Sequence, residues 1–396
     1  MAAPDVIIVG GGVIGCATAY YLTQAGAAVT ILERGEVGGE ASGAAPAVLG
    51  AGVWPVVDLS TSMEAGSLLD LCVASMRLHR PLAEALRQET GIDVEYLRSG
   101  VLRVALTEED ANDLRGFVGQ VAWEDAPEEL RAFVGPQGEW GLLQWVDPEV
   151  LRGLEPRVSP QAYGAVYVPH LPHVNGHHLT LALAQAAVAR GAVLRQGLAV
   201  TGFLTSDSRV IGVRTSEGRM MAGQVLLAAG AWTGVLGQRL GLTLPVKPMR
   251  GQVLAFPNFR PPVRHILADK DGCSLVPKAN NFLWGAATVE DVGFRKNTTA
   301  RGRAALRRMA ASLVPSLAYA EGASDWAGLR PGSHDGLPVL GPIPGWEGLS
   351  VASGHFRRGI VLAPITGRLM AQRLTEGRTD MPLEPFTPAR FAASPH

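Results

Sequence analysis

Hydrophobic and polar residues alternate along this chain with the periods of both strands and helices. Residues 6–9 form an unbroken apolar run that ends in a glycine-rich turn. An alanine-rich helical stretch follows at residues 13–26, and a second apolar run occupies residues 27–33. Short continuous apolar runs are typical of strands that are buried on both faces. The first 33 residues therefore predict a strand, a helix and a second strand in one βαβ unit.

Later segments add further strands and helices. Residues 209–232 alternate apolar and polar positions around Ser216–Gly218, as an antiparallel hairpin does, before a buried strand that ends in glycine. Several strand-like pieces follow, separated by Pro, Asn and Gly. We expect helices at residues 61–91, 107–131, 178–189, 299–313 and 360–377, and strands at residues 192–196, 252–257, 273–277, 282–289 and 349–354.

The first glycine turn has a spacing that carries chemistry. Gly10, Gly12 and Gly15 give G-x-G-x-x-G between a strand and a helix, and Glu33 ends the second strand. Glycines permit the tight turn and a close approach of the backbone to a pyrophosphate, and the helix amino terminus favours the phosphate charge. The carboxylate of Glu33 can accept hydrogen bonds from ribose hydroxyls. The sequence therefore predicts a dinucleotide site.

The small-residue stretch at residues 34–50 favours FAD over NAD. It could follow a long dinucleotide across the protein, whereas an NAD dehydrogenase more often returns at once to a third strand. The order of the elements predicts nucleotide-binding pieces at the start, middle and end of the chain, with antiparallel-sheet segments inserted between them. A chain of 396 residues exceeds the usual size of one core. The predicted FAD-binding domain is discontinuous, at residues 1–80, 147–228 and 327–396, and the substrate domain comprises residues 81–146 and 229–326.

Five segments together resemble one enzyme family. GGGVIGCATAYYLTQAG, ERGEVGGEASGAA, LLAAGAW, WAGLRPGSHDGLPVLG and ASGHFRRGIVLAPITGRLM are similar to the D-amino-acid oxidase family, and most of all to its glycine oxidase branch, which serves thiazole (thiamine) synthesis. The resemblance implies an α/β and α+β protein with an FAD/NAD(P)-binding Rossmann-like three-layer domain and an inserted antiparallel-sheet substrate domain. It also implies hydride transfer from a small amino acid or amine (glycine, sarcosine or a small D-amino acid) to FAD. The imine would hydrolyse to an oxo acid, and O2 would reoxidise the flavin to give hydrogen peroxide.

The resemblance also implies the contacts of the cofactor. Residues 333–338 contain no cysteine that could attach a flavin, so the FAD is expected to be noncovalent. The helix that starts near Gly359 would point its amino terminus at the flavin. The expected FAD-binding residues are Gly10, Gly12, Val13, Ile14, Gly15, Glu33, Arg34, Ala41, Ser42, Pro46, Ala47, Val48, Val200, Gly230, His355, Phe356, Arg357, Arg358, Gly359, Ile360 and Val361.

On the substrate side the resemblance implies two arginines. Arg330 would hold the carboxylate with both guanidinium nitrogens, and Arg357 would lie at the same site. Ser274 and Met249 are expected in the pocket. Many glycine oxidases carry Tyr where this chain has Ser274, so a roomier pocket is expected. We name no acid–base residue.

Composition and charge limit the kinds of partner and the cellular location that can be expected. A net charge of −1 without a basic stripe gives no support to a nucleic-acid partner. The three cysteines are far apart, and no apolar run is long enough for a membrane span, so we expect a cytoplasmic protein that could form a homo-oligomer. We expect no metal site, and interpret His170, His173, His177 and His178 as solvated loop residues.

Three alternatives stay open. A dehydrogenase of the same fold would pass electrons to a quinone or carrier protein in place of O2. A noncatalytic flavin-binding module and an NAD-linked dehydrogenase are the others. The absorption spectrum of the purified protein and its oxygen consumption would separate them.

Overall fold

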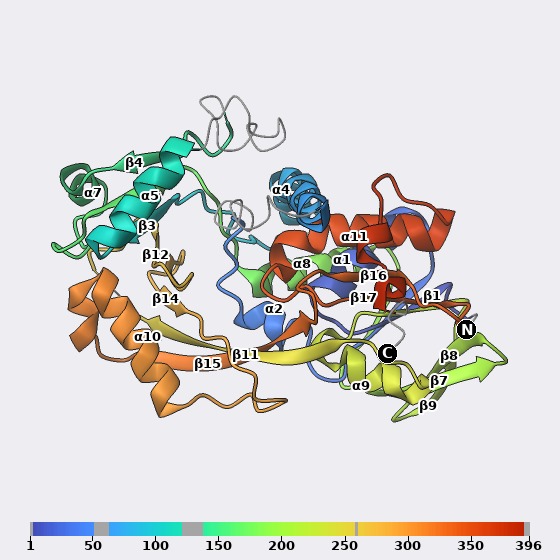
Figure 1. Ribbon diagram of the computed structural model, residues 1–396. Helices are drawn as coiled ribbons and strands as arrows, with labels where there is room; N and C mark the ends of the chain where they lie inside the picture. Colours follow the sequence, from blue (N-terminus) through green and yellow to red (C-terminus); the bar gives the residue numbers. More distant parts are fainter. Residues whose placement is uncertain (1–2, 51–62, 121–137, 258–259, 392–396) are drawn as a thin grey trace.

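The computed structural model describes residues 3–50, 63–120, 138–257 and 260–391. Within these ranges the chain forms a mixed α/β fold with three β-sheets (Figure 1). None of the helices in these ranges is both long and apolar enough to cross a membrane.

The apolar runs of the βαβ unit lie at the centre of a six-stranded sheet. All neighbouring strands in it are parallel except β16 and β17, which are antiparallel. Every residue of the first two strands is buried, which explains their lack of polar alternation. In spatial order the strands are β16 (Val339–Pro342), β17 (Leu349–Ser353), β10 (Gln224–Leu227), β1 (Val6–Val9), β2 (Val29–Leu32) and β6 (Val193–Arg195).

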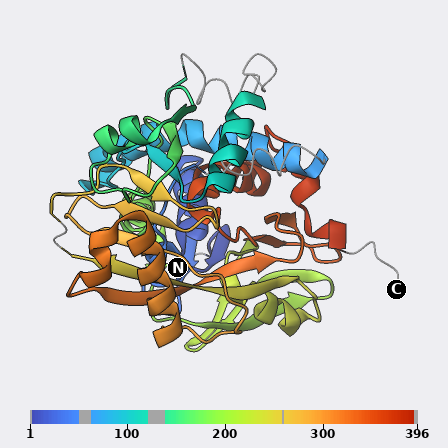
Figure 2. The same ribbon diagram turned by 60° about the vertical axis from the view of Figure 1, so that its left-hand side comes forward.

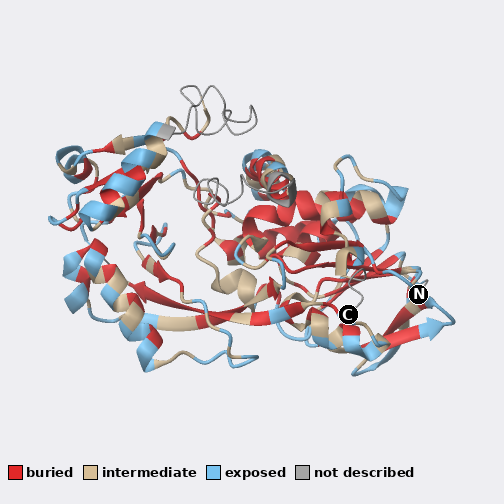
Figure 3. Cartoon of the chain, in the orientation of Figure 1, coloured by how far each residue is buried: buried red, intermediate tan, exposed pale blue. Residues whose placement is uncertain are grey.

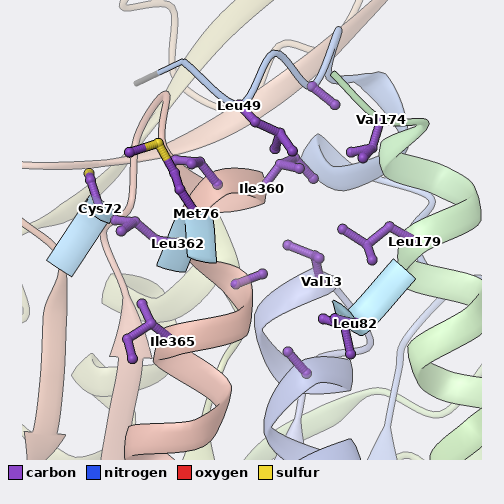
Figure 4. Packing of buried hydrophobic residues seen from close by; sticks show 14 of the residues in the cluster. Val13, Leu49, Cys72, Met76, Leu82, Val174, Leu179, Ile360, Leu362 and Ile365 are labelled. Carbon is purple, nitrogen blue, oxygen red and sulfur yellow. The ribbon is translucent and has the colours of Figure 1, made fainter. Parts of the chain in front are cut away.

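Two further layers cover this sheet. Helices α1 (Val13–Gln24), α8 (Gly176–Ala189) and α11 (Gly359–Glu376) pack together, with α4 (Met63–Thr90) against them. Val13, Met76, Leu179 and Ile365 meet in their common core (Figure 4). A second core lies between the six-stranded sheet and a three-stranded antiparallel sheet. That sheet consists of β7 (Val200–Ser206), β8 (Arg209–Thr215) and β9 (Gly218–Met221).

An eight-stranded, mostly antiparallel sheet forms the other part of the molecule (Figures 1 and 2). Its face toward α10 (Ala300–Leu313) and α7 (Pro148–Leu154) is apolar and buried (Figure 3). The long strands β11 and β15 run from this part toward the six-stranded sheet (Figure 1). The order is β15 (Ser324–Ser333), β11 (Val246–Phe256), β14 (Leu283–Ala286), β13 (Ser274–Pro277), β12 (Ile266–Ala268), β3 (Val101–Ala105), β5 (Gly164–Val168) and β4 (Gln144–Val146).

The predicted fold class is confirmed, including the three-layer part and the antiparallel sheet. The helix expected at residues 107–131 is α5 (Glu108–Gln120), and residues 121–131 lie outside the described ranges. The domain boundaries stay a prediction, but three of them cut through the observed packing, and the one after residue 326 divides β15. Strand β5 pairs with β3 and β4 in the eight-stranded sheet, although the predicted division puts it in the FAD-binding domain. The boundary at residue 80 divides the continuous helix α4.

Candidate functional site

A cavity of about 1260 Å³ lies where the six-stranded and eight-stranded sheets meet. Its lining begins at the glycine turn after β1, follows residues 40–48, and includes the turn before α11. The other wall comes from β11, β12, β13 and β15 of the eight-stranded sheet. Both predicted parts of the site therefore face one space.

The glycine turn is packed so closely against the surrounding backbone that side chains cannot fit at two of its positions. Gly10 has φ of 117°, and a Cβ on it would collide with the carbonyl oxygen of Ala228. A Cβ on Gly15 would collide with the carbonyl oxygen of Gly10. Gly15 does not itself line the cavity, so it serves the close packing of α1 against the turn.

Polar groups surround this turn. The Glu33 carboxylate accepts hydrogen bonds from the amides of Gly11 (2.7 Å) and Gly35 (2.8 Å). The Ser42 hydroxyl accepts one from the amide of Val13 at 3.0 Å. The first hydrogen bond within α1 runs from the Cys16 amide to the carbonyl of Gly12, and Ser42 takes the Val13 amide, which leaves the amides of Ile14 and Gly15 without a partner inside the helix. This donor set fits a pyrophosphate with a ribose near Glu33.

A second helix terminus faces the cavity at α11. Its first hydrogen bond runs from the Leu362 amide to the Arg358 carbonyl, so the amides of residues 359–361 precede it. No side chain caps this helix, and its first turn lines the cavity. The arrangement would stabilise negative charge on a bound group.

The turn before α11 is held by buried contacts. The amide of Phe356, which has φ of 48°, donates to the carbonyl of Pro331 at 2.8 Å. His355 is buried, and its Nε2 lies 3.1 Å from the Thr366 hydroxyl. Burial lowers the pKa of His355 to about 3, so the imidazole is neutral near pH 7.

Arg330 lies on β15 with its half-buried side chain at the cavity wall. Its Nη1 donates to the carbonyl of Thr288 at 2.9 Å, and the guanidinium covers the position that a side chain on Gly251 would need. Burial, with a smaller contribution from the charge of Arg357, lowers the pKa of Arg330 to about 10, so it stays cationic near neutral pH. Among the described residues, no carboxylate forms an ion pair with it.

The carbonyl that orients Arg330 belongs to a buried polar network. The Thr288 hydroxyl donates to Glu290 Oε1 at 2.5 Å and accepts from the Gln252 amide at 3.0 Å. Glu290 Oε2 accepts from Arg250 at 2.5 Å, and Arg250 is buried. The side chain of Gln252 also donates to Glu290, at 2.7 Å. These contacts fix the strand segment on which Arg330 depends.

Arg357 and Ser274 line the cavity, whereas Met249 does not. Arg357 is exposed, and its Nη2 donates to the carbonyl of Gly272 at 2.7 Å. The side chain of Met249 instead lies against Gly332, in the position that a Cβ there would occupy. Cross-strand partners project from the same face of a sheet, so Met249 and Arg330 share a face. The Met249 side chain lies over Gly332 and the Arg330 guanidinium over Gly251, in opposite directions along the strands.

Lys278 connects the eight-stranded sheet to the small-residue stretch. Its buried Nζ donates to the carbonyls of Pro46 (2.8 Å) and Val174 (3.0 Å) and lies 4.8 Å from the ring centre of Trp284. Burial lowers the pKa of Lys278 to about 7. The contact fixes the backbone at Pro46, next to Ala47, which has φ of 59°.

Most residues predicted for the site share this cavity. The predicted lining residues that the structure brings together are Gly10, Gly12, Val13, Ile14, Glu33, Arg34, Ala41, Ser42, Pro46, Ala47, Val48, Val200, Gly230, Ser274, Arg330, His355, Phe356, Arg357, Arg358, Gly359, Ile360 and Val361.

Sequence reasoning missed several contacts and misplaced three of the four histidines expected in solvated loops, of which His177 and His178 lie in the first turn of helix α8. Trp232 stacks on the Arg34 guanidinium, 3.6 Å from its ring centre. The lone glycine of the strand segment MRGQVL could have indicated the close approach of a side chain to Gly251. The interpretation of His173 as a solvated loop residue is wrong, because its side chain is fully buried and its Nε2 lies 3.1 Å from the Ser99 hydroxyl.

Comparison with known proteins agrees with this geometry. The sequence pattern of the FAD dependent oxidoreductase family matches residues 5–373. A glycine oxidase of Geobacillus kaustophilus is 37% identical over 387 residues, which cover 98% of this chain and 97% of that protein.

Two other relatives also align over almost their whole length. A hydrogen cyanide synthase subunit of Pseudomonas aeruginosa is 32% identical, with 99% of this chain and 97% of that protein covered. The crystal structure of a glycine oxidase from Bacillus cereus superposes with a TM-score of 0.84 at 29% identity, covering 96% of this chain and 99% of that one.

Proposed function

The chain belongs to the family of FAD-dependent oxidoreductases, and from this we propose that it oxidises a small amino acid or amine in the manner of a glycine oxidase. Glycine, sarcosine and small D-amino acids are the proposed substrates, O2 is the proposed electron acceptor, and an oxo acid and hydrogen peroxide are the products. If glycine is a substrate, its oxidation would serve thiazole (thiamine) synthesis, as the sequence resemblance implies.

Arg330 is the observation that carries this proposal. A cationic guanidinium at a cavity wall, oriented by a backbone carbonyl and without a carboxylate partner in the described ranges, suits a substrate carboxylate. Held in this way, the carboxylate fixes the α-carbon relative to the rest of the cavity. Such positioning lowers the barrier of a transfer step because orientation is set before the reaction.

The remaining residues have supporting roles in the proposed reaction. FAD, bound noncovalently, would supply the hydride acceptor. The glycine turn and Glu33 would hold its pyrophosphate and ribose, and the terminus of α11 would stabilise negative charge on the reduced ring. The neutral His355 adds no charge beside that ring. The hydride leaves the α-carbon as the amine becomes an imine, and water then hydrolyses the imine.

The direct test uses the purified yellow protein. Under anaerobic conditions, glycine, sarcosine or D-alanine should bleach the flavin absorption, and admission of O2 should restore it with one peroxide per turnover. A protein whose flavin none of these amines reduces would contradict the proposal. Bleaching without reoxidation by O2 would instead favour a dehydrogenase.

The role of Arg330 has its own test. Arg330→Ala should keep the flavin spectrum but lower kcat/KM for flavin reduction at least about tenfold, because a charge-assisted hydrogen bond contributes about 1.5–3 kcal/mol. Arg330→Lys should recover part of the loss, since it keeps the charge without the two-pronged geometry. Arg219→Ala, an exposed change on β9, is the control. Unchanged reduction in Arg330→Ala would transfer the role to Arg357.

A further inference from the structure

The cavity extends beyond the dinucleotide and Arg330 into a region that the proposed reaction does not use. Its volume of about 1260 Å³ exceeds the roughly 300–1,000 Å³ of most ligand pockets. The additional walls come from β3, β12 and one side of α5. Glycine would leave this region empty.

A trough crosses the sheet here, with the small side chains of Ala268, Ser274 and Ala286 on its floor and Arg103 at its end. Arg103, Ala268, Ser274 and Ala286 are successive cross-strand partners on β3, β12, β13 and β14. All four line the cavity, whereas Leu267, next to Ala268, points into the core on the opposite face. Two strand spacings separate Ser274 from Arg103, or about 10 Å. Ala268 leaves the space between them open.

The trough has apolar sides and a charged end. Leu114 and Phe117 of α5 line it, as does Ile266 of β12. At its far end the Arg103 guanidinium forms two hydrogen bonds with Asp110, at 3.2 and 3.3 Å. Both side chains of this ion pair are mostly buried. A paired guanidinium and carboxylate offer a donor and an acceptor without a large net charge, which suits a hydroxyl or amide better than an ion.

We propose that the preferred substrate is an amino acid with an extended, largely apolar substituent that lies over Ala268 and ends in a hydroxyl or amide at the Arg103–Asp110 pair. The substituent is carried by the nitrogen or the α-carbon, while the carboxylate stays on Arg330. This inference rests on the proposed function and names the substrate class of the same site.

The test compares short and long substrates by anaerobic flavin reduction of the full-length holoenzyme. N-(5-hydroxypentyl)glycine should have a kcat/KM at least about tenfold above that of sarcosine, since one buried methylene alone can raise kcat/KM by about tenfold. N-pentylglycine tests the polar end, and D-2-aminoheptanoic acid tests attachment at the α-carbon. If only one of the two attachment points gives the gain, that result identifies the substituted atom.

Two variants probe opposite ends of the trough. Ala268→Phe should lower the ratio of long-substrate to sarcosine kcat/KM at least about tenfold, because the ring fills the trough. Asp110→Asn should remove the preference for the hydroxylated chain over the pentyl chain. Glu109→Gln, an exposed change on the same helix, is the matched control. Asp110→Asn keeps the test valid if Ala268→Phe does not fold.

The outcomes separate this inference from the function beneath it. Reduction by glycine or sarcosine without any gain for the long substrates overturns the inference alone. Equal effects of Ala268→Phe on long and short substrates overturn it as well. If no amine of either length reduces the flavin, the proposed function fails and the inference fails with it.

Discussion

Arg330 and Gly251 occupy complementary positions on neighbouring strands. The guanidinium lies where a Cβ on residue 251 would be, and the Thr288 carbonyl fixes it there. Gly251 is on a strand and not in a left-handed conformation, so alanine is compatible with its backbone. The glycine is therefore explained by the side chain that covers it.

This explanation predicts the effect of Gly251→Ala. The added methyl should displace the guanidinium and lower kcat/KM for flavin reduction at least about tenfold, as loss of a charge-assisted contact does, while the flavin spectrum persists. Gly285→Ala on β14 is the matched control, because its Cβ would meet neighbours at an ordinary 3.4 Å. Equal rates in the two variants would contradict the role assigned to Gly251.

The individual residues show where sequence reasoning is strong. Glycine spacing encodes a local backbone shape, so the turn at Gly10 could be predicted from the sequence. The Thr288 carbonyl could not, because every residue has a carbonyl and only the sheet register places this one beside Arg330. Met249 failed as a pocket residue for a similar reason. It shares a sheet face with Arg330, but its side chain lies over Gly332, on the opposite side of Arg330 from Gly251, and does not line the cavity.

Helices α4 and α11 show how one element positions another. Pro364 interrupts α11 because it has no amide hydrogen, and the surrounding backbone groups find partners on α4. The Ser75 hydroxyl donates to the Val361 carbonyl at 2.6 Å and accepts from the Ile365 amide at 3.3 Å. His79 also lies 2.9 Å from that carbonyl. Side chains of α4 therefore fix the end of α11 that lines the cavity.

Ser75→Ala tests this packing. The change leaves a buried amide without its acceptor, so the free energy of unfolding should fall by about 1–3 kcal/mol. FAD should also dissociate more readily, because the amides of residues 359–361 lose their fixed position. Urea unfolding and flavin release measure the two effects. Ser312→Ala on α10, where the hydroxyl is exposed, is the control, and an equal loss in both variants would contradict the argument.

Most helices and strands could be predicted from the period of hydrophobic residues along the chain. The predicted helix at residues 299–313 is α10, with Thr299 as its amino-terminal cap. The pairing of β5 with β3 and β4 could not be predicted from the sequence, because a short buried strand carries no sign of its partner and distant segments decide the pairing. Periodicity predicts an element's type better than its neighbours.

Buried histidines make the stability of the whole molecule depend on pH. Burial lowers the pKa of His79 to about 4 and those of His173 and His355 to about 3. The unfolded chain binds protons at these sites near pH 6.5, so it gains protons that the folded chain does not, and stability falls as pH drops below 6.5 toward 4. Each histidine should cost about 2 kcal/mol between pH 7 and pH 5.

Urea midpoints measured from pH 7 to pH 5 check this dependence. The midpoint should fall steeply, and His173→Gln should flatten the slope by removing one titrating group. His334→Gln, on the surface, is the matched control. A midpoint that is constant over this range would show that these histidines do not titrate on unfolding.

Noncovalent FAD should link the two large sheets thermodynamically. The cavity takes its walls from both sheets, and none of the three cysteines of the chain is among its lining residues in the described ranges. A ligand that binds only the folded state adds about 2.7 kcal/mol at a hundred times its Kd. Removal of FAD should therefore lower the Tm, and added FAD should raise it in a concentration-dependent way.

Acid precipitation should release all the yellow colour into the supernatant, whereas flavin left in the pellet would indicate a covalent bond and contradict this prediction.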